Sequence, residues 1–290
     1  MFSNLFKTKP VIDESSKEWI YDSFSWCMQQ LDGEFFKDQS ELVLPNNHFY
    51  PGSSTSVDEM ASNIFTNTCQ YTGMSQWPIK LVNADTFIAK TMPQLSFSNR
   101  LRGDNAQITF GSEISFKLEG QQVNQVPAIE IAFHQSQLNQ PQDLIAYLVQ
   151  HQAGILVAQQ ASGLAVSGLS TSGHETVTAS APGGKEVMAQ TIDLVACFMG
   201  FGVIFANTAY QFKGGCGSCN NRSLNRQAAL PELETVYALA LFCVIKGLEV
   251  KQVKKELKSH LYKPFRQAHK EITLYLQQTT NPNHALLTSK

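Results

Sequence analysis

Two segments near the N-terminus carry apolar residues at the spacing of one helix face. In the first, Ser15-Ser16-Lys17-Glu18 has the pattern of a capping box, and apolar residues follow it at helical spacing as far as Leu31. The second begins at Ser56 and ends at Gly73, since glycine readily adopts the left-handed conformation that closes a helix. We predict a helix in each segment.

Short runs of alternating or mixed apolar residues come next, and they predict strands. These strands cover residues 79–82, 108–110, 114–116 and 129–133. Because they precede the long helical segments instead of alternating with them, they favour a small sheet over a doubly wound one.

From residue 141 onward the apolar pattern is typical of long helices. We predict helices over residues 143–161, 186–212, 231–244 and 250–277. A stretch rich in Gly, Ser and Thr, residues 162–184, is long for a connection inside a compact domain, so it is either a functional loop or a mobile one. The last dozen residues are expected to fray.

These elements predict an α+β protein. The small sheet belongs to an N-terminal part, residues 1–136, and a predominantly helical part follows, residues 137–290. With 290 residues, of which 43% are hydrophobic, the chain can bury a sizeable core, and we expect the two parts to form one compact unit.

The net charge and the distribution of basic residues indicate whether a nucleic acid is an expected partner. The net charge is −2, and basic residues are dispersed except for a cluster over residues 251–270, which we interpret as the solvated side of the last long helix. Nucleic-acid binding usually needs a basic face or stripe, so no nucleic-acid partner is expected.

The apolar runs and the cysteines indicate a compartment. The N-terminus lacks the apolar run of a signal peptide, and the most apolar stretch, residues 194–206, is shorter than the roughly twenty residues that a membrane span needs. We therefore expect a buried core helix there and no membrane span. Of the six cysteines, Cys197 and Cys243 lie in apolar helical runs and are expected to be small buried hydrophobes, which favours a reduced, cytoplasmic protein.

Three segments resemble a bacterial family of largely uncharacterised zincin-like proteins. They are PQDLIAYLVQHQAGI (residues 141–155), TIDLVACFMGFGVIFANTA (191–209) and VYALALFCVIKG (236–247). The first is similar to the family helix that carries an HExxH motif, and the likeness extends over roughly residues 13–275. The resemblance implies a zincin-like fold for the helical part and a relationship to zinc metallopeptidases.

The zinc chemistry of HExxH depends on its spacing, and this chain departs from it. Two His residues four apart bind the metal, the Glu between them is the general base, and a later helix provides a third ligand. By the resemblance, His151 matches the first ligand, Gln152 stands in place of the base, and Ile155 replaces the second ligand. Ala189 stands at the third ligand, and Asp193 matches a carboxylate that orients a ligand. We therefore predict that no catalytic zinc site survives.

Each of these residues also has a plainer interpretation. His151 is expected to be a buried, hydrogen-bonded core residue, and Ile155 to extend the apolar stripe of its helix. Asp193 either forms a salt bridge or cap within the helix pair, or keeps a hydrogen bond to His151.

A second candidate metal site is the pair Cys216 and Cys219. Two cysteines at this spacing in a Gly-rich loop form half of a zinc site, but the chain has no second CxxC, so four ligands would require a homodimer. A redox pair would need a thioredoxin-like context that is absent, and the simplest interpretation is a loop with two thiols. His174, Glu175 and Glu186 are the remaining residues that could replace lost ligands.

Two hypotheses follow from these residues. The first is a non-catalytic zincin-like pseudoenzyme without a cofactor that binds a protein or peptide in a regulatory role. The alternative is a metal-dependent hydrolase with a rearranged site, built from His151 with loop groups or the cysteine pair. The sequence does not name the partner or substrate.

Overall fold

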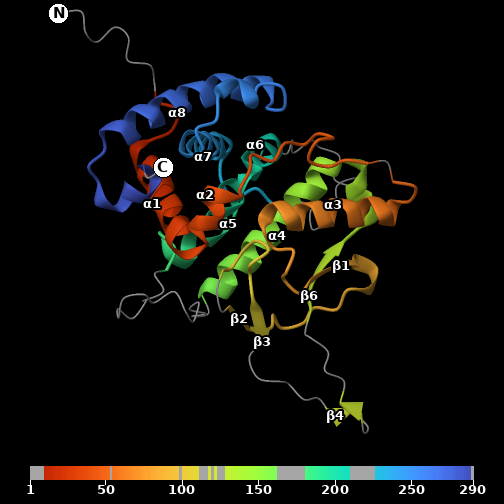
Figure 1. The fold of residues 1–290 in the computed structure, drawn as a ribbon. Coiled ribbons are helices and arrows are strands. Elements are labelled where there is room, and N and C mark those ends of the chain that lie inside the picture. Colours follow the sequence, from red (N-terminus) through yellow and green to blue (C-terminus); the bar gives the residue numbers. More distant parts are fainter. Residues whose placement is uncertain are drawn as a thin grey trace, which may run out of the picture.

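The structure of the chain, a computed structural model, describes residues 10–52, 54–97, 100–110, 117–118, 121–122, 128–161, 180–209 and 226–288. Most of the chain is helical, with a small parallel sheet, so the expected α+β class is confirmed. Figure 1 shows the helices packed in several layers, with the short strands below them. The predicted loop over 162–184 lies outside the described residues up to residue 179, as do His174, Glu175, Cys216 and Cys219.

The N-terminal helices are α1 (Glu14–Gln30), α2 (Gly33–Asp38) and α3 (Val57–Thr72). The predicted capping box over residues 15–18 is wrong, because the cap of α1 is Asp13, whose carboxylate accepts the Ser16 N–H at 2.9 Å. The prediction for α3 is confirmed, since the Ser56 hydroxyl caps its start and Gly73, at φ 74°, closes its end.

The strands form pairs. β1 (Ile79–Asn83) lies parallel to β6 (Ile129–Phe133), and β2 (Leu95–Phe97) lies antiparallel to β3 (Ile108–Phe110). A further antiparallel pair joins β4 (Lys117–Leu118) to β5 (Gln121–Gln122). Three of the four predicted strands are confirmed, and the fourth, 114–116, lies outside the described residues.

The remaining long helices are α4 (Pro141–Ala161), α5 (Met188–Ala196), α6 (Gly202–Thr208), α7 (Glu232–Ile245) and α8 (Ser259–Gln278). The predictions for α4 and α7 are confirmed. The helix predicted from residue 250 begins later, because residues 250–252 form only a 3-10 turn. The prediction of a frayed C-terminus is wrong, since residues 285–288 form α9 and Leu287 is buried.

The helix predicted over residues 186–212 is interrupted at Gly200. A π turn over Cys197–Phe201 separates α5 from α6, and Gly200 has a φ of 99°. The carbonyl of Gly200 accepts the Val43 N–H at 3.0 Å, and a Cβ here would collide with the Glu41 carbonyl oxygen. Only glycine meets both the backbone angle and the close approach.

One hydrophobic core includes residues from both predicted parts of the chain. The apolar run 194–206 lies inside this core, and both Cys197 and Cys243 are buried there, as expected. The segment Gly184–Thr208 is long and apolar enough to cross a bilayer, but 72% of its most apolar window is buried by other elements. This burial is what a core helix of a soluble protein also shows, and the absence of a membrane span remains a prediction.

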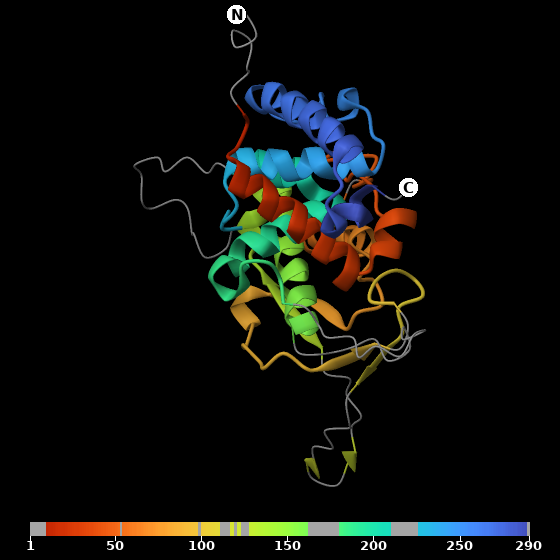
Figure 2. The same cartoon turned by 90° about the vertical axis from the view of Figure 1, so that its left-hand side faces the viewer.

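The two ends of the described chain meet at α1. The His284 ring joins Asp22 of α1 to Tyr275 of α8, with Nε2 2.8 Å from the carboxylate and Nδ1 2.6 Å from the phenol oxygen. The Tyr275 ring also stacks on Tyr21 at a centroid distance of 4.4 Å. Figure 2 shows α1 lying across α7, with the C-terminal turn beside it.

Candidate functional site

Gln152, at the position of the expected general base, is built into the core. Its Oε1 accepts the Thr72 hydroxyl at 2.8 Å, and its Nε2 lies 3.2 Å from the Cys69 sulfur, so the carboxamide joins α4 to α3. The side chain has no exposed surface. Ile155 is buried on the same helix, which confirms the expectation that it extends the apolar stripe.

His151 is held by its own helix. Its Nδ1 donates to the Tyr147 carbonyl at 2.9 Å, and the two rings lie 4.1 Å apart. The expected hydrogen bond is therefore present, but the expected burial is wrong, because the residue is exposed. Desolvation by the surrounding protein lowers the pKa of His151, and the carbonyl acts against this in part, so the neutral ring is favoured.

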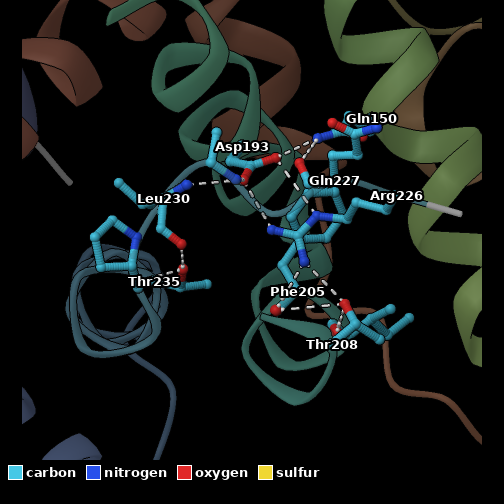
Figure 3. A network of polar contacts seen from close by, with 11 residues as sticks. Gln150, Asp193, Phe205, Thr208, Arg226, Gln227, Leu230 and Thr235 are labelled. Carbon is cyan, nitrogen blue, oxygen red and sulfur yellow. Dashed lines mark hydrogen bonds and ion pairs between the residues drawn. The ribbon is translucent and has the colours of Figure 1, made fainter. Parts of the chain in front are cut away.

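Asp193 is fully buried and forms an ion pair with Arg226, whose Nη2 lies 2.9 Å from Oδ2. The carboxylate also accepts the backbone N–H groups of Ala229 and Leu230 at 2.8 and 3.0 Å, and the Gln150 side chain at 2.7 Å (Figure 3). Of the two interpretations of Asp193, the salt bridge is confirmed, although its partner lies outside the helix pair.

Arg226 extends this network to α6. Its Nη1 donates to the Phe205 carbonyl at 3.1 Å and to the Thr208 hydroxyl at 2.9 Å, and the guanidinium lies 3.9 Å from the Phe205 ring centroid (Figure 3). The network fixes the segment 226–230 onto α5 and α6 and positions the start of α7. Its chemistry is structural, since each charge is met by the other and by hydrogen bonds.

The positions matched by the resemblance do not meet in one site. Gln150, one residue before His151, is the α4 side chain that reaches Asp193. Ala189 and Glu186 are exposed. Among the described residues, no group of three or more His, Cys, Asp or Glu side chains is arranged to hold a metal ion. Cys216 and Cys219 lie outside those residues.

A groove on another face carries a different chemistry. It encloses about 380 Å³ between the loop of residues 45–54, α3 and the start of α4. Five of its side chains are carboxamides, and none of the fourteen lining residues carries a formal charge; the carboxamides belong to Asn46, Asn47, Asn63, Asn67 and Gln142. Pro45, Pro51, Tyr50 and Ile145 add apolar surface.

The groove is preformed by hydrogen bonds at its rim. Asn63 donates to the Ser54 hydroxyl at 3.2 Å, and the Tyr50 hydroxyl lies 3.4 Å from the Thr68 hydroxyl. In the described part of the chain, the carboxamides of Asn47 and Gln142 have no protein partner, whereas Asn46 donates to Glu256 at 3.3 Å. The groove thus offers neutral donors and acceptors beside apolar surface, as small-ligand sites commonly do.

Sequence reasoning missed both Arg226 and the groove. Arg226 follows a long irregular segment, where no periodicity shows which element its side chain would meet. The groove did leave a signal, because Asn63 and Asn67 are four apart on a predicted helix and therefore lie on one face.

Comparisons with protein-family models, with curated proteins and with solved structures found no match to this chain.

Proposed function

We propose that this protein is a non-catalytic, zincin-like binding module, and that its groove holds an extended segment of an uncharged peptide. The zincin-like part of the proposal rests on the resemblance of three helical segments. Its non-catalytic part is supported by the contacts of two matched residues. Gln152 is hydrogen-bonded to Thr72 inside the core, and Asp193 forms an ion pair with Arg226.

The observation that carries the peptide proposal is the spacing of carboxamides in the groove. Asn63 and Asn67 are four residues apart on α3, which places them about 6 Å apart along the helix axis. In an extended peptide, every second residue presents its main-chain groups to the same side, at a repeat of about 6.5 Å. The Nδ2 of Asn63 donates to Ser54 and the Nδ2 of Asn67 donates to the Asn63 carbonyl, so each side chain keeps its Oδ1 and one N–H for a ligand. The two repeats match closely enough for these free groups to meet alternate residues of the peptide.

The chemistry of the groove agrees with this ligand. In an extended peptide the N–H and C=O of one residue point to the same side, so a carboxamide can accept that N–H through its Oδ1 while one of its own N–H groups donates to that C=O. The groove has no charged lining residue, and a charged ligand would lose water there without gaining an ion pair. Tyr50, with Pro45 and Pro51, provides an apolar wall for uncharged side chains.

The test uses random heptapeptides displayed on phage and selected on the immobilised full-length chain. We expect enrichment of uncharged sequences, and we expect Asn63→Ala/Asn67→Ala to weaken the Kd of a selected peptide about tenfold or more, as two lost hydrogen bonds require. Thr66→Ala/Gln70→Ala is the matched control, because it truncates exposed polar residues at the same spacing on α3 but outside the groove. No enrichment, or equal weakening in the control, would contradict the proposal.

A separate measurement tests the non-catalytic part. Elemental analysis of the purified wild-type chain and of His151→Ala should give the same zinc content, because His151 is held by Tyr147 and has no ligand partner among the described residues. About one equivalent of zinc in the wild type and none in the variant would favour the metal-dependent hydrolase instead. Zinc that disappears with Cys216→Ser would belong to the cysteine pair.

A further inference from the structure

Helix α8 has two opposite faces of contrasting chemistry. One is buried against α7 and consists of Leu261, Phe265, Ala268 and Ile272. The opposite side forms an outer line of six exposed residues, which a 100° rotation per residue places within one narrow stripe. This outer line consists of Ser259, Lys263, Arg266, Lys270, Leu274 and Gln277.

The positive charge of the outer line is not neutralised by neighbouring acids. In the described part of the chain, no salt bridge involves Lys263, Arg266 or Lys270. The acidic residue of α8, Glu271, points to the other side, where it pairs with the buried Lys17 and accepts the Tyr237 hydroxyl. The segment before α8 adds three exposed cations, Lys254, Lys255 and Lys258.

This concentration of charge contrasts with the rest of the chain. Without the six cations named above, the chain has 16 Lys and Arg against 24 Asp and Glu, so the rest of the sequence carries a net negative charge. The outer line is thus the side that an anionic surface would attract, and the attraction would orient the whole molecule. A solvated helix face commonly intersperses both signs, but the three charged residues of the outer line are all basic.

The exposed Leu274 favours a lipid surface over a nucleic acid as the anionic partner. It lies on the same line as the cations and is 47% exposed, so the strip combines basic groups with an apolar side chain. Basic side chains with an adjacent apolar one are typical of a helix that lies in a membrane interface, where cations meet lipid phosphates and leucine enters the acyl boundary. Figures 1 and 2 show α8 at the outer edge of the molecule, where a flat surface can reach it.

We propose that the outer line of α8 binds the protein peripherally to an anionic lipid bilayer. Lys263, Arg266 and Lys270 lie within about 11 Å along the axis, and Leu274 follows about 6 Å further on, so one continuous strip contacts the headgroups. This surface is separate from the groove on α3, and the two proposals stand independently.

The test measures co-sedimentation of the full-length chain with vesicles of phosphatidylcholine containing 30% phosphatidylserine. We expect binding that is absent with pure phosphatidylcholine and is lost in 0.5 M NaCl, because salt screens the attraction. Lys263→Gln/Arg266→Gln/Lys270→Gln should lower the partition coefficient about 100-fold, since each basic residue near such a surface contributes roughly fivefold. Leu274→Ser should lower it severalfold while leaving its salt dependence in place.

The matched control is Lys37→Gln/Lys80→Gln/Lys185→Gln, which removes three exposed cations outside α8. It should change the partition coefficient less than threefold. Equal binding to neutral and anionic vesicles, or an equal loss in the control, would overturn the proposal. If the protein does not bind vesicles but binds a 20-nucleotide single-stranded DNA through the same three cations, the membrane proposal is wrong and the partner is a nucleic acid. Circular dichroism of each variant verifies that its helices are retained.

Discussion

Replacing Asp193 by alanine tests whether the buried ion pair holds the helical part together. The change removes the acceptor of five N–H groups, which come from Gln150, Arg226, Ala229 and Leu230. The guanidinium of Arg226 is 1% exposed, so it would remain buried without a counter-charge. Breaking a buried pair in this way costs about 3–5 kcal/mol, and the unpaired backbone groups add to that.

The assay is urea unfolding followed by circular dichroism. Because a cost of this size is a large fraction of a typical stability of about 5–15 kcal/mol, Asp193→Ala should shift the midpoint strongly or leave the chain unfolded. If Asp193→Ala does not fold, the double variant Asp193→Ala/Arg226→Met still tests the role of the ion pair, since it removes both charges and keeps apolar volume. We expect this double variant to be more stable than Asp193→Ala alone by at least about 2 kcal/mol.

An exposed ion pair provides the control. The side chains of Lys251 and Glu249 are 77% and 66% exposed, so Lys251→Gln should change the free energy of unfolding by less than about 1 kcal/mol. If Asp193→Ala costs no more than this control, or if the effects of Asp193→Ala and Arg226→Met simply add, the network does not carry the stability assigned to it.

Three further changes test other features by the same unfolding assay. Gly200→Ala should cost about 2–4 kcal/mol, because a Cβ would collide with the Glu41 carbonyl oxygen at a positive φ; a neutral result would contradict the constraint. Gln152→Glu should cost about 2 kcal/mol or more at pH 8 and less at pH 5, because a carboxylate would be buried beside Thr72; no pH dependence would refute its burial. Because the folded state lowers the pKa of His151, wild type should lose stability relative to His151→Gln as the pH falls from 7.5 to 5.5, through the unfolded value of about 6.5. A constant difference between those two proteins would show that the ring titrates alike in both states.

The parts of the fold that local sequence determines were predictable. Ser56 and Gly73 predict the start and the end of α3, and the apolar residues of β1 and β6 predict those two strands. The break at Gly200 was not predictable, because the apolar run contains two glycines, Gly200 and Gly202, and the sequence does not show that either one leaves the helical conformation. What forces the π turn is the approach of residues 41–43, which are distant in sequence.

The candidate site shows a similar division. That Gln152 cannot serve as a base follows from its chemistry, but its bonds to α3 depend on how two helices pack. The resemblance aligned His151 with Asp193, whereas the packing of α4 on α5 brings Gln150 there instead. A shift of one residue rotates a side chain by about 100° around a helix, and a motif comparison does not detect it.

The contact of α1 with His284 has a consequence for the time course of folding. The bond between Asp22 and His284 joins residues 262 positions apart, and the stacking of Tyr21 on Tyr275 spans nearly as much chain. At synthesis rates of about 5–20 residues per second, α1 leaves the ribosome more than ten seconds before these partners exist. During that interval α1, whose Ile20 and Phe24 are fully buried in the finished protein, lacks its contacts with residues 282–288. The nascent chain therefore exposes an apolar helix face for longer than a small protein with local contacts would, and a chaperone that shields such faces would act on it during this interval.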